Sequence, residues 1–203
     1  MRCLTMGGRE PGIASLSHLR GRSALTPFRA QRLQQSLTDE LPGLRRIDAE
    51  YLYFIERHET LDAAEQELLE RLLDARPATS CDYAFIVVPR PGTISPWSSK
   101  ATDIVHNCGL DRVTRVERGI AWMVDMSNGG VGHGHVTRAL AARVHDRMTE
   151  AIIADVDAAH TLFEHAAARP LRSVRVMARG RVALEDANRD MGCLLYTSDA
   201  ADE

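Results

Sequence analysis

Two long stretches of the chain, residues 44–56 and 113–126, alternate between apolar and polar positions with a period of two. The apolar positions of the first stretch are Ile47, Ala49, Tyr51, Tyr53 and Ile55. Those of the second stretch are Val116, Ile120, Trp122, Val124 and Met126. Alternation over this length is typical of a β-strand that buries one of its faces. We therefore predict two long, half-buried strands.

Shorter elements are predicted around these two strands. Short apolar runs at residues 16–19 and 83–88 favour strands. Apolar residues at helical spacing predict helices over residues 24–35, 61–74, 95–108 and 136–153, with Ser23, Thr60 and Ser95 or Ser98 as N-caps. The order strand, helix, long strand, helix then occurs twice. The prediction is an α+β fold with an antiparallel sheet backed by helices, and the repetition is either a pseudo-repeat or a coincidence.

The pattern changes after residue 150. Residues 155–168 are rich in alanine and helical in pattern, and Pro170 ends that segment. Residues 173–177 are strand-like, and residues 180–189 are helical again. We interpret these segments as the start of a linker-like unit. Residues 1–18 are interpreted as an irregular extension, because glycine and proline interrupt every periodic pattern there.

Composition and charge exclude several classes of protein. The 203 residues are 44% hydrophobic and 26% charged, as in an ordinary soluble globular protein. A net charge of −3 argues against a nucleic-acid partner. No apolar run approaches the ~20 residues that span a bilayer, so no membrane partner is expected. The first 20 residues lack the apolar stretch of a secretory signal.

Neither a metal site nor a disulfide framework is predicted. The cysteines, Cys3, Cys81, Cys108 and Cys193, have no C-x-x-C spacing and no clustered histidines. Reduced thiols indicate a cytoplasmic protein. His133 and His135 lie in a glycine-rich turn and are interpreted as solvated loop residues.

The segment PRPGTISPWSSKATDI, residues 89–104, carries the most unusual chemistry. Pro96 suits the first position of a helix and Ser95 suits its N-cap. The backbone amides of that helix start, together with hydroxyls and Lys100, are groups that hold a phosphate or carboxylate. Trp97 is placed to cover a ligand or to seal an interface. The alternative is a well-capped helix joined to a rigid, proline-rich turn.

This segment, extended to residue 107, closely resembles the N-terminal domain of the large, single-chain phosphoribosylformylglycinamidine synthases. Shorter segments on both sides of it also match the family, in the same order as in the family's sequences, over about residues 19–192. They include LRG at residues 19–21, AEY at 49–51, CGL at 108–110, RVERG at 115–119 and HDRM at 145–148.

The resemblance implies a concrete parent enzyme. This family transfers ammonia, released from glutamine, to formylglycinamide ribonucleotide, and it uses ATP and magnesium in this step of purine synthesis. The family's chain runs from an N-terminal domain through a linker to a synthase domain and a glutaminase domain. Its N-terminal domain resembles a fused pair of small subunits, which agrees with the repeated pattern. Residues 19–150 would be the N-terminal domain and residues 151–192 the start of the linker.

The catalytic and metal-binding residues of the family belong to domains outside this sequence. The resemblance therefore implies an inactive fragment that binds neither ATP nor magnesium, and whose partners are the synthase and glutaminase domains of the same chain. No residue here is assigned as catalytic or metal-ligating. Residues 193–203, CLLYTSDAADE, resemble a translated sequencing adaptor, and we expect them not to belong to the natural protein.

The motif loop is expected to face the synthase active site. Its candidate substrate-binding residues are Arg90, Thr93, Ser95, Ser98, Ser99 and Lys100. His106 and Asn107 are interpreted as groups that cap the end of the motif helix, and His145 as a packing residue. Two alternatives remain: a stand-alone subunit that docks on a separate synthase chain, and a regulatory domain that binds a nucleotide at this loop.

Overall fold

The computed structural model describes residues 15–78, 83–127, 133–164, 170 and 173–191. It divides into two compact units, residues 1–165 and 166–203, which are described separately. Residues 1–14 and 193–203, for which an irregular extension and an adaptor were predicted, lie outside the described residues. No helix in the described part is long and apolar enough to cross a bilayer.

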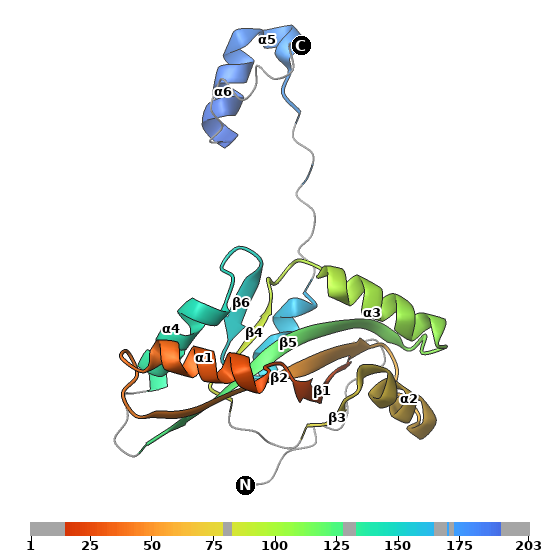
Figure 1. Cartoon of the computed structure of the whole chain (residues 1–203). Coiled ribbons are helices and arrows are strands. Elements are labelled where there is room, and N and C mark those ends of the chain that lie inside the picture. Colours follow the sequence, from red (N-terminus) through yellow and green to blue (C-terminus); the bar gives the residue numbers. More distant parts are fainter. Residues whose placement is uncertain (1–14, 79–82, 128–132, 165–169, 171–172, 192–203) are drawn as a thin grey trace. The chain divides into compact units, whose positions relative to one another are not determined.

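The first unit is built on one six-stranded antiparallel sheet (Figure 1). The strand order is β3-β1-β2-β5-β4-β6. The strands are β1 (Ser15–Ser23), β2 (Leu44–Arg57), β3 (Arg76–Pro77), β4 (Phe85–Pro89), β5 (Val113–Met126) and β6 (Glu150–Ile153). The two long strands, β2 and β5, lie at the centre and pair from one end to the other. The predicted α+β class and both long strands are confirmed, whereas the twofold pseudo-repeat stays a prediction.

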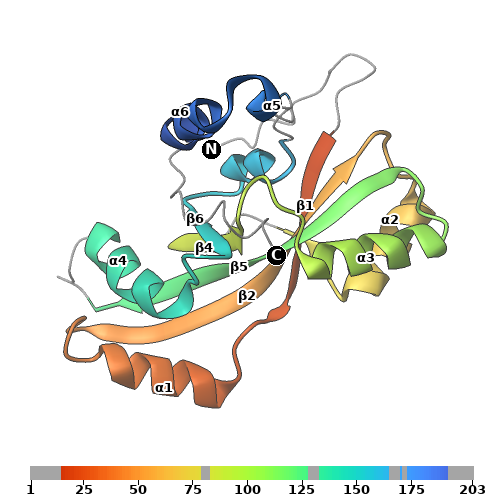
Figure 2. The same cartoon turned by 90° about the horizontal axis from the view of Figure 1, so that it is seen from above.

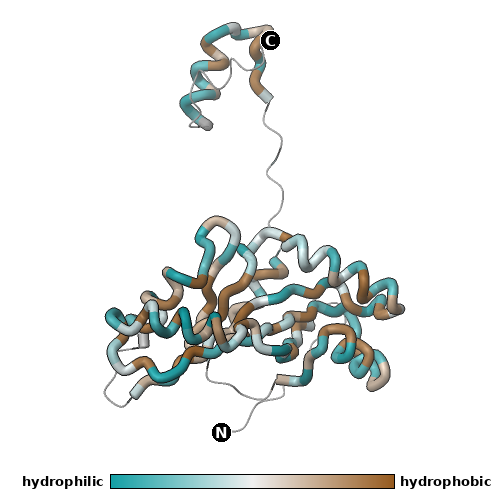
Figure 3. The backbone as a smooth tube through the Cα atoms, in the orientation of Figure 1, coloured by the Kyte–Doolittle hydropathy of each residue, from teal (hydrophilic) through white to brown (hydrophobic). Residues whose placement is uncertain are grey.

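In the described part of the first unit, four helices pack on the sheet in two pairs. They are α1 (Pro27–Leu37), α2 (Ala63–Leu73), α3 (Pro96–Asn107) and α4 (His133–Val144). Figure 2 shows α1 and α4 over one end of the long strands, and α2 and α3 over the other. Each pair covers its own core cluster, one around Trp122 and one around Tyr53. Figure 3 shows the hydrophobic residues concentrated along the strands beneath these helices.

The central strands are buried on both faces, so the prediction of half-buried strands is wrong for their middle. Leu52 and Phe54 point away from the Tyr53 cluster, and yet neither is exposed to solvent. They pack in a third cluster with Leu162 and Phe163. Leu162 is the last residue of a 3-10 helix, η1 (Asp157–Leu162), and Phe163 follows it. This helix covers the second face of the sheet.

Two helices begin later than their sequence pattern predicted. Ser23 still belongs to β1, and Thr26 caps α1, because Pro27 supplies a ready first helical position. Asp62, not Thr60, caps α2. Its carboxylate accepts the amides of Ala64 and Glu65, and the Glu65 carboxylate accepts the amide of Asp62. This reciprocal capping box satisfies more donors than a threonine cap would.

We expect Asp62→Ala to lower the free energy of unfolding by about 1 kcal/mol, because the cap of α2 is lost. Thr60→Ala is the matched control, since Thr60 is exposed and its side chain caps nothing. Urea unfolding of both variants checks this. A larger loss for Thr60→Ala than for Asp62→Ala would show that the helix begins where the sequence pattern placed it.

The helix predicted over residues 136–153 is wrong in its second half. The carboxylate of Asp146 accepts bonds from the Met148 amide and the Thr149 hydroxyl, and this turn follows the end of α4. Residues 150–153 then pair with β4 as β6, which supplies hydrogen-bond partners to that edge. The first unit therefore includes β6, and the predicted linker over residues 151–192 stays a prediction.

In its described part, the second unit is mainly helical from Val176 onward. It contains α5 (Val176–Arg179) and α6 (Arg181–Met191). The helix predicted over residues 180–189 agrees with α6. The strand predicted over residues 173–177 is wrong, because the backbone turns helical at Val176. The helix predicted over residues 155–168 is the shorter η1 in the described part of that segment.

His18, in β1, makes the stability of the first unit sensitive to pH. Burial lowers the pKa of His18 from its usual 6.5, and the negative charge of Asp157 opposes this only in part. The unfolded chain thus takes up this proton at a higher pH than the folded protein does. The stabilisation is present above pH 6.5 and is lost as the pH falls towards the lower pKa of the folded state. We expect His18→Gln to flatten the decline of unfolding free energy between about pH 7 and 5 in urea titrations. An unchanged decline would contradict the assignment.

Candidate functional site

The motif loop, residues 90–95, connects β4 to the start of α3. Gly92 has φ +81°, a left-handed conformation that favours glycine in this turn. The Thr93 hydroxyl donates to the carbonyl of Arg90 at 2.6 Å, which closes the loop on itself. Ser95 caps α3 by accepting the amide of Ser98 at 3.0 Å, and Pro96 takes the first helical position. The predicted start of this helix is confirmed.

A buried ion pair on β5 holds the loop in place. Arg115 and Glu117 are two residues apart on one face of the strand, and their side chains meet at 2.5 Å. The Glu117 carboxylate is fully buried. It accepts the amide of Ser95 at 3.1 Å and the hydroxyl of Ser95 at 2.9 Å. The N-cap residue of α3 is thus tied directly to β5.

Arg115 extends the same network to two further segments. Its guanidinium donates to the carbonyl of Thr93 at 2.9 Å and to the carbonyl of Leu162 at 3.1 Å. It also lies 5.2 Å from the centre of the Phe163 ring. A buried charge is tolerated only when it is paired and hydrogen-bonded, and both members of this pair are. The motif loop, β5 and the end of η1 are therefore one connected polar structure.

The network changes the interpretation of the helix start. The sequence predicted that free donors at Ser95 and the following amides hold a ligand's phosphate or carboxylate. Both donors of Ser95 bind the protein's own Glu117 carboxylate, and the Ser98 amide binds Ser95. An external anion would have to displace a buried carboxylate, which is costly.

A cavity of about 450 Å³ lies beside the motif loop. Its lining comes from β4, the loop, the first residues of α3, the middle of β5 and the start of β6. The lining residues are Val87, Val88, Pro89, Arg90, Thr93, Ile94, Ser95, Pro96, Trp97, Arg118, Ile120, Met148, Thr149 and Glu150. A cavity of this size with mostly apolar walls is typical of a small-molecule site.

The six predicted site residues divide into two groups. Arg90, Thr93 and Ser95 line the cavity, whereas the other three do not. Ser98 is fully buried, and its hydroxyl accepts from Nε of Arg115 at 3.4 Å. Ser99 and Lys100 are exposed on α3. The structure thus brings half of the candidates to one surface and places Ser98 beneath the loop as a support.

Arg118 lines the same cavity between two aromatic rings. Its guanidinium carbon lies 4.6 Å from the centre of the Tyr51 ring and 4.7 Å from that of Trp97. Trp97 also stacks on Tyr53, with ring centres 5.6 Å apart. Burial raises the pKa of Tyr53, and the nearby positive charges of Arg118 and Arg22 oppose that rise. Cation–π contacts of this kind hold a positive charge in a defined place.

Sequence reasoning missed Arg115, Glu117 and Arg118 as site residues. In the predicted strand over residues 113–126, only the apolar positions were considered. The informative signal was that three charges, Arg115, Glu117 and Arg118, lie within four positions of a long predicted strand. In a central strand, such charges are retained where they are paired or face a cavity.

The predicted roles of the histidines can be compared with their contacts. A ring nitrogen of His106 lies 2.6 Å from the carbonyl oxygen of Val113, so His106 ties the end of α3 to β5. A ring nitrogen of His145 lies 3.2 Å from the carbonyl of Glu150. His135 is exposed, and the side chain of His133 lies outside the described residues. Within the described part of the chain, no three metal-ligating side chains cluster.

The fold and the loop can now be placed in a family. A family model described as "Formylglycinamide ribonucleotide amidotransferase N-terminal" matches residues 50–163. The match begins in β2, includes the motif loop and the Arg115–Glu117 pair, and ends at Phe163 on the second face of the sheet. It covers more than half of the chain, so the chain belongs to this family. The matched residues form the N-terminal domain of the formylglycinamide ribonucleotide amidotransferases, which are enzymes of purine biosynthesis.

Proposed function

We propose that this chain is the N-terminal part of a cytoplasmic phosphoribosylformylglycinamidine synthase. The complete enzyme would transfer ammonia from glutamine to formylglycinamide ribonucleotide, with ATP and magnesium bound by domains outside this sequence. The partners of the chain would be the synthase and glutaminase domains that follow it, and the fragment itself would be inactive. The family match over residues 50–163 supports this proposal.

The motif loop would form part of the wall that encloses the substrate in the complete enzyme. The observation that carries this role is the buried Arg115–Glu117 pair, which holds Thr93 and Ser95 at the edge of a cavity. Arg90, Thr93 and Ser95 would face the substrate. Ser98 would act from below the loop, and Ser99 and Lys100 would act from the exposed side of α3. A loop fixed by buried charges is preorganised, as a binding site requires.

Steady-state kinetics of the complete enzyme test this role. We expect Arg90→Ala and Lys100→Ala each to raise the KM for formylglycinamide ribonucleotide by about tenfold, because each removes one charge-assisted contact. Arg45→Ala is the matched control, since Arg45 is an exposed arginine of β2 outside the cavity lining. If kcat and KM of both variants equal those of the control, the loop does not enclose substrate.

A further inference from the structure

Arg118 is a positive group whose hydrogen-bonding capacity is not used by the described part of the protein. Its side chain is half-buried and lies between the rings of Tyr51 and Trp97. Over the described residues, its guanidinium makes these ring contacts and no hydrogen bond or ion pair. The five N–H donors of a guanidinium are directed along its edges, and no described residue accepts a hydrogen bond from those of Arg118. The edges of Arg118 thus remain available to an acceptor in the cavity.

The neighbouring arginine of β5 behaves differently. Arg115 is buried, and its donors go to Glu117, Thr93 and Leu162. Glu117 in turn takes the donors of Ser95, so the buried carboxylate is already occupied. Glu117 therefore neutralises Arg115 and accepts the donors at the start of α3, whereas Arg118 has no ion pair among the described residues. Arg90, on the same cavity, is exposed and likewise makes no side-chain ion pair with the described residues.

We propose that the cavity beside the motif loop binds a small molecule through its anionic group, a carboxylate or a phosphate, which accepts hydrogen bonds from Arg118. A planar guanidinium matches both anions with two parallel bonds. The ring contacts of Tyr51 and Trp97 hold the guanidinium in a defined place, which reduces the entropy lost on binding. Arg90 adds a second positive charge to the lining. This site goes beyond the proposed enclosing role of the loop, and it does not require the catalytic domains.

The rest of the lining limits the kind of molecule that fits. Ile94 and Met148 are 56% and 77% exposed, and they give the cavity an apolar rim that a ligand's uncharged body would cover. Glu150 adds one negative charge to the lining, and its carboxylate accepts the amide of Asp146 at 2.8 Å. A second anionic group near β6 would be repelled there. The structure thus favours a ligand with one anionic end and a neutral body.

The experiment titrates the 203-residue chain with two probes, ribose 5-phosphate and N-acetylglycine, which carry a phosphate and a carboxylate. The indole N–H signals of Trp97 and Trp122 in a ¹H–¹⁵N NMR spectrum report binding. Trp97 lines the cavity, whereas Trp122 does not line it and serves as an internal reference. We expect Trp97 to shift with a Kd of about 1 mM or tighter for at least one probe. The responding probe assigns the class of anion.

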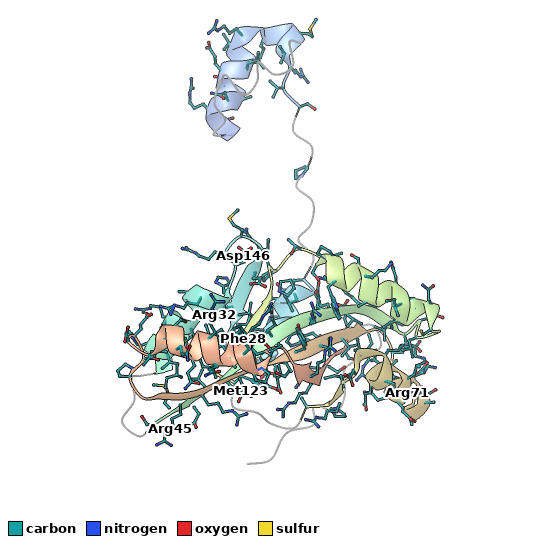
Figure 4. The ribbon with its side chains drawn as sticks, viewed as in Figure 1. Phe28, Arg32, Arg45, Arg71, Met123 and Asp146 are labelled. Carbon is teal, nitrogen blue, oxygen red and sulfur yellow. The ribbon has the colours of Figure 1, made fainter. Side chains whose placement is uncertain are left out.

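Arg118→Gln is expected to weaken that binding about tenfold or more, because the charge and the paired donors are lost. Arg118→Lys keeps the positive charge but lacks the planar guanidinium. We expect its affinity for the probe to lie between those of Arg118→Gln and the unaltered chain. Arg45→Gln is the control: Figure 4 labels this arginine, which does not line the cavity. Unchanged Trp122 signals in each variant would show that the fold is kept.

Three results would overturn the proposal. They are no Trp97 shift with either probe up to about 20 mM, equal affinity of Arg118→Gln and the unaltered chain, or equal weakening by Arg45→Gln. None of them bears on the enclosing role of the loop, which rests on the kinetics of Arg90 and Lys100 variants in the complete enzyme. Failure of the one proposal is thereby distinguishable from failure of the other.

Discussion

Replacing Glu117 with alanine is expected to lower the free energy of unfolding of the first unit by about 3–5 kcal/mol. The substitution leaves the guanidinium of Arg115 buried without its counter-charge, and it removes the acceptor of both Ser95 donors. Breaking a buried pair from one side is more costly than never having formed it. Unfolding in guanidinium chloride, followed by circular dichroism, measures the loss.

The control for this prediction is Glu67→Ala, which removes an exposed glutamate of α2 and should change the unfolding free energy by less than about 0.5 kcal/mol. The double replacement Glu117→Leu with Arg115→Met removes both charges, and we expect it to recover part of the loss. If Glu117→Ala costs no more than the control, the pair does not hold the loop in the way described.

Phe54→Ala is expected to cost about 3–5 kcal/mol, as is usual for a fully buried phenylalanine. Phe54 has no exposed surface and packs with Leu162 and Phe163 on the second face of the sheet. The prediction tests directly whether β2 is buried on both faces. Phe28→Ala is the matched control, because the Phe28 side chain is 70% exposed on α1, where Figure 4 labels it.

Urea unfolding of both phenylalanine variants decides whether β2 is buried on one face or on both. If β2 were half-buried, as the sequence predicted, Phe54 would face solvent. Both variants would then lose a similar, small amount of unfolding free energy. In the structure, η1 covers that side, and only Phe54→Ala is strongly destabilising. Similar values for the two variants would contradict the packing of η1 on the sheet.

The parts of the fold that the sequence predicted are those with a long, regular pattern. Alternation over residues 44–56 and 113–126 identified the central strands, and Ser95-Pro96 identified the start of α3. The errors occurred where two local signals compete. Ser23 and Thr26 are both good N-caps, and only the pairing of Ser23 with Glu50 in the sheet excludes the first.

Other features depend on contacts between segments that are distant in the sequence. Nothing local indicates that residues 157–163 cover the second face of β2, which is why the alternation was interpreted as half-buried. The strand β6 is four residues long, and its apolar residues were read as a continuation of α4. Its place is decided by pairing with β4.

In the candidate site too, local sequence predicted some features, and others depend on contacts between distant segments. The motif identified the loop, and three of its six candidate residues line the cavity. The cavity itself is formed by β4, β5 and β6 together, and Arg118 is held in place by Tyr51 of a fourth strand, β2. The charge pattern of β5 alone cannot predict a contact with a residue of another strand.

Amplifying the gene from its source DNA and reading it beyond the codon for Gly192 would show whether the chain belongs to a longer enzyme. We expect the frame to continue through a linker into a synthase domain and then a glutaminase domain, and the codons for residues 193–203 to be absent. A frame that ends at Glu203 would contradict this expectation, and the chain would then be a stand-alone subunit that docks on a separate synthase.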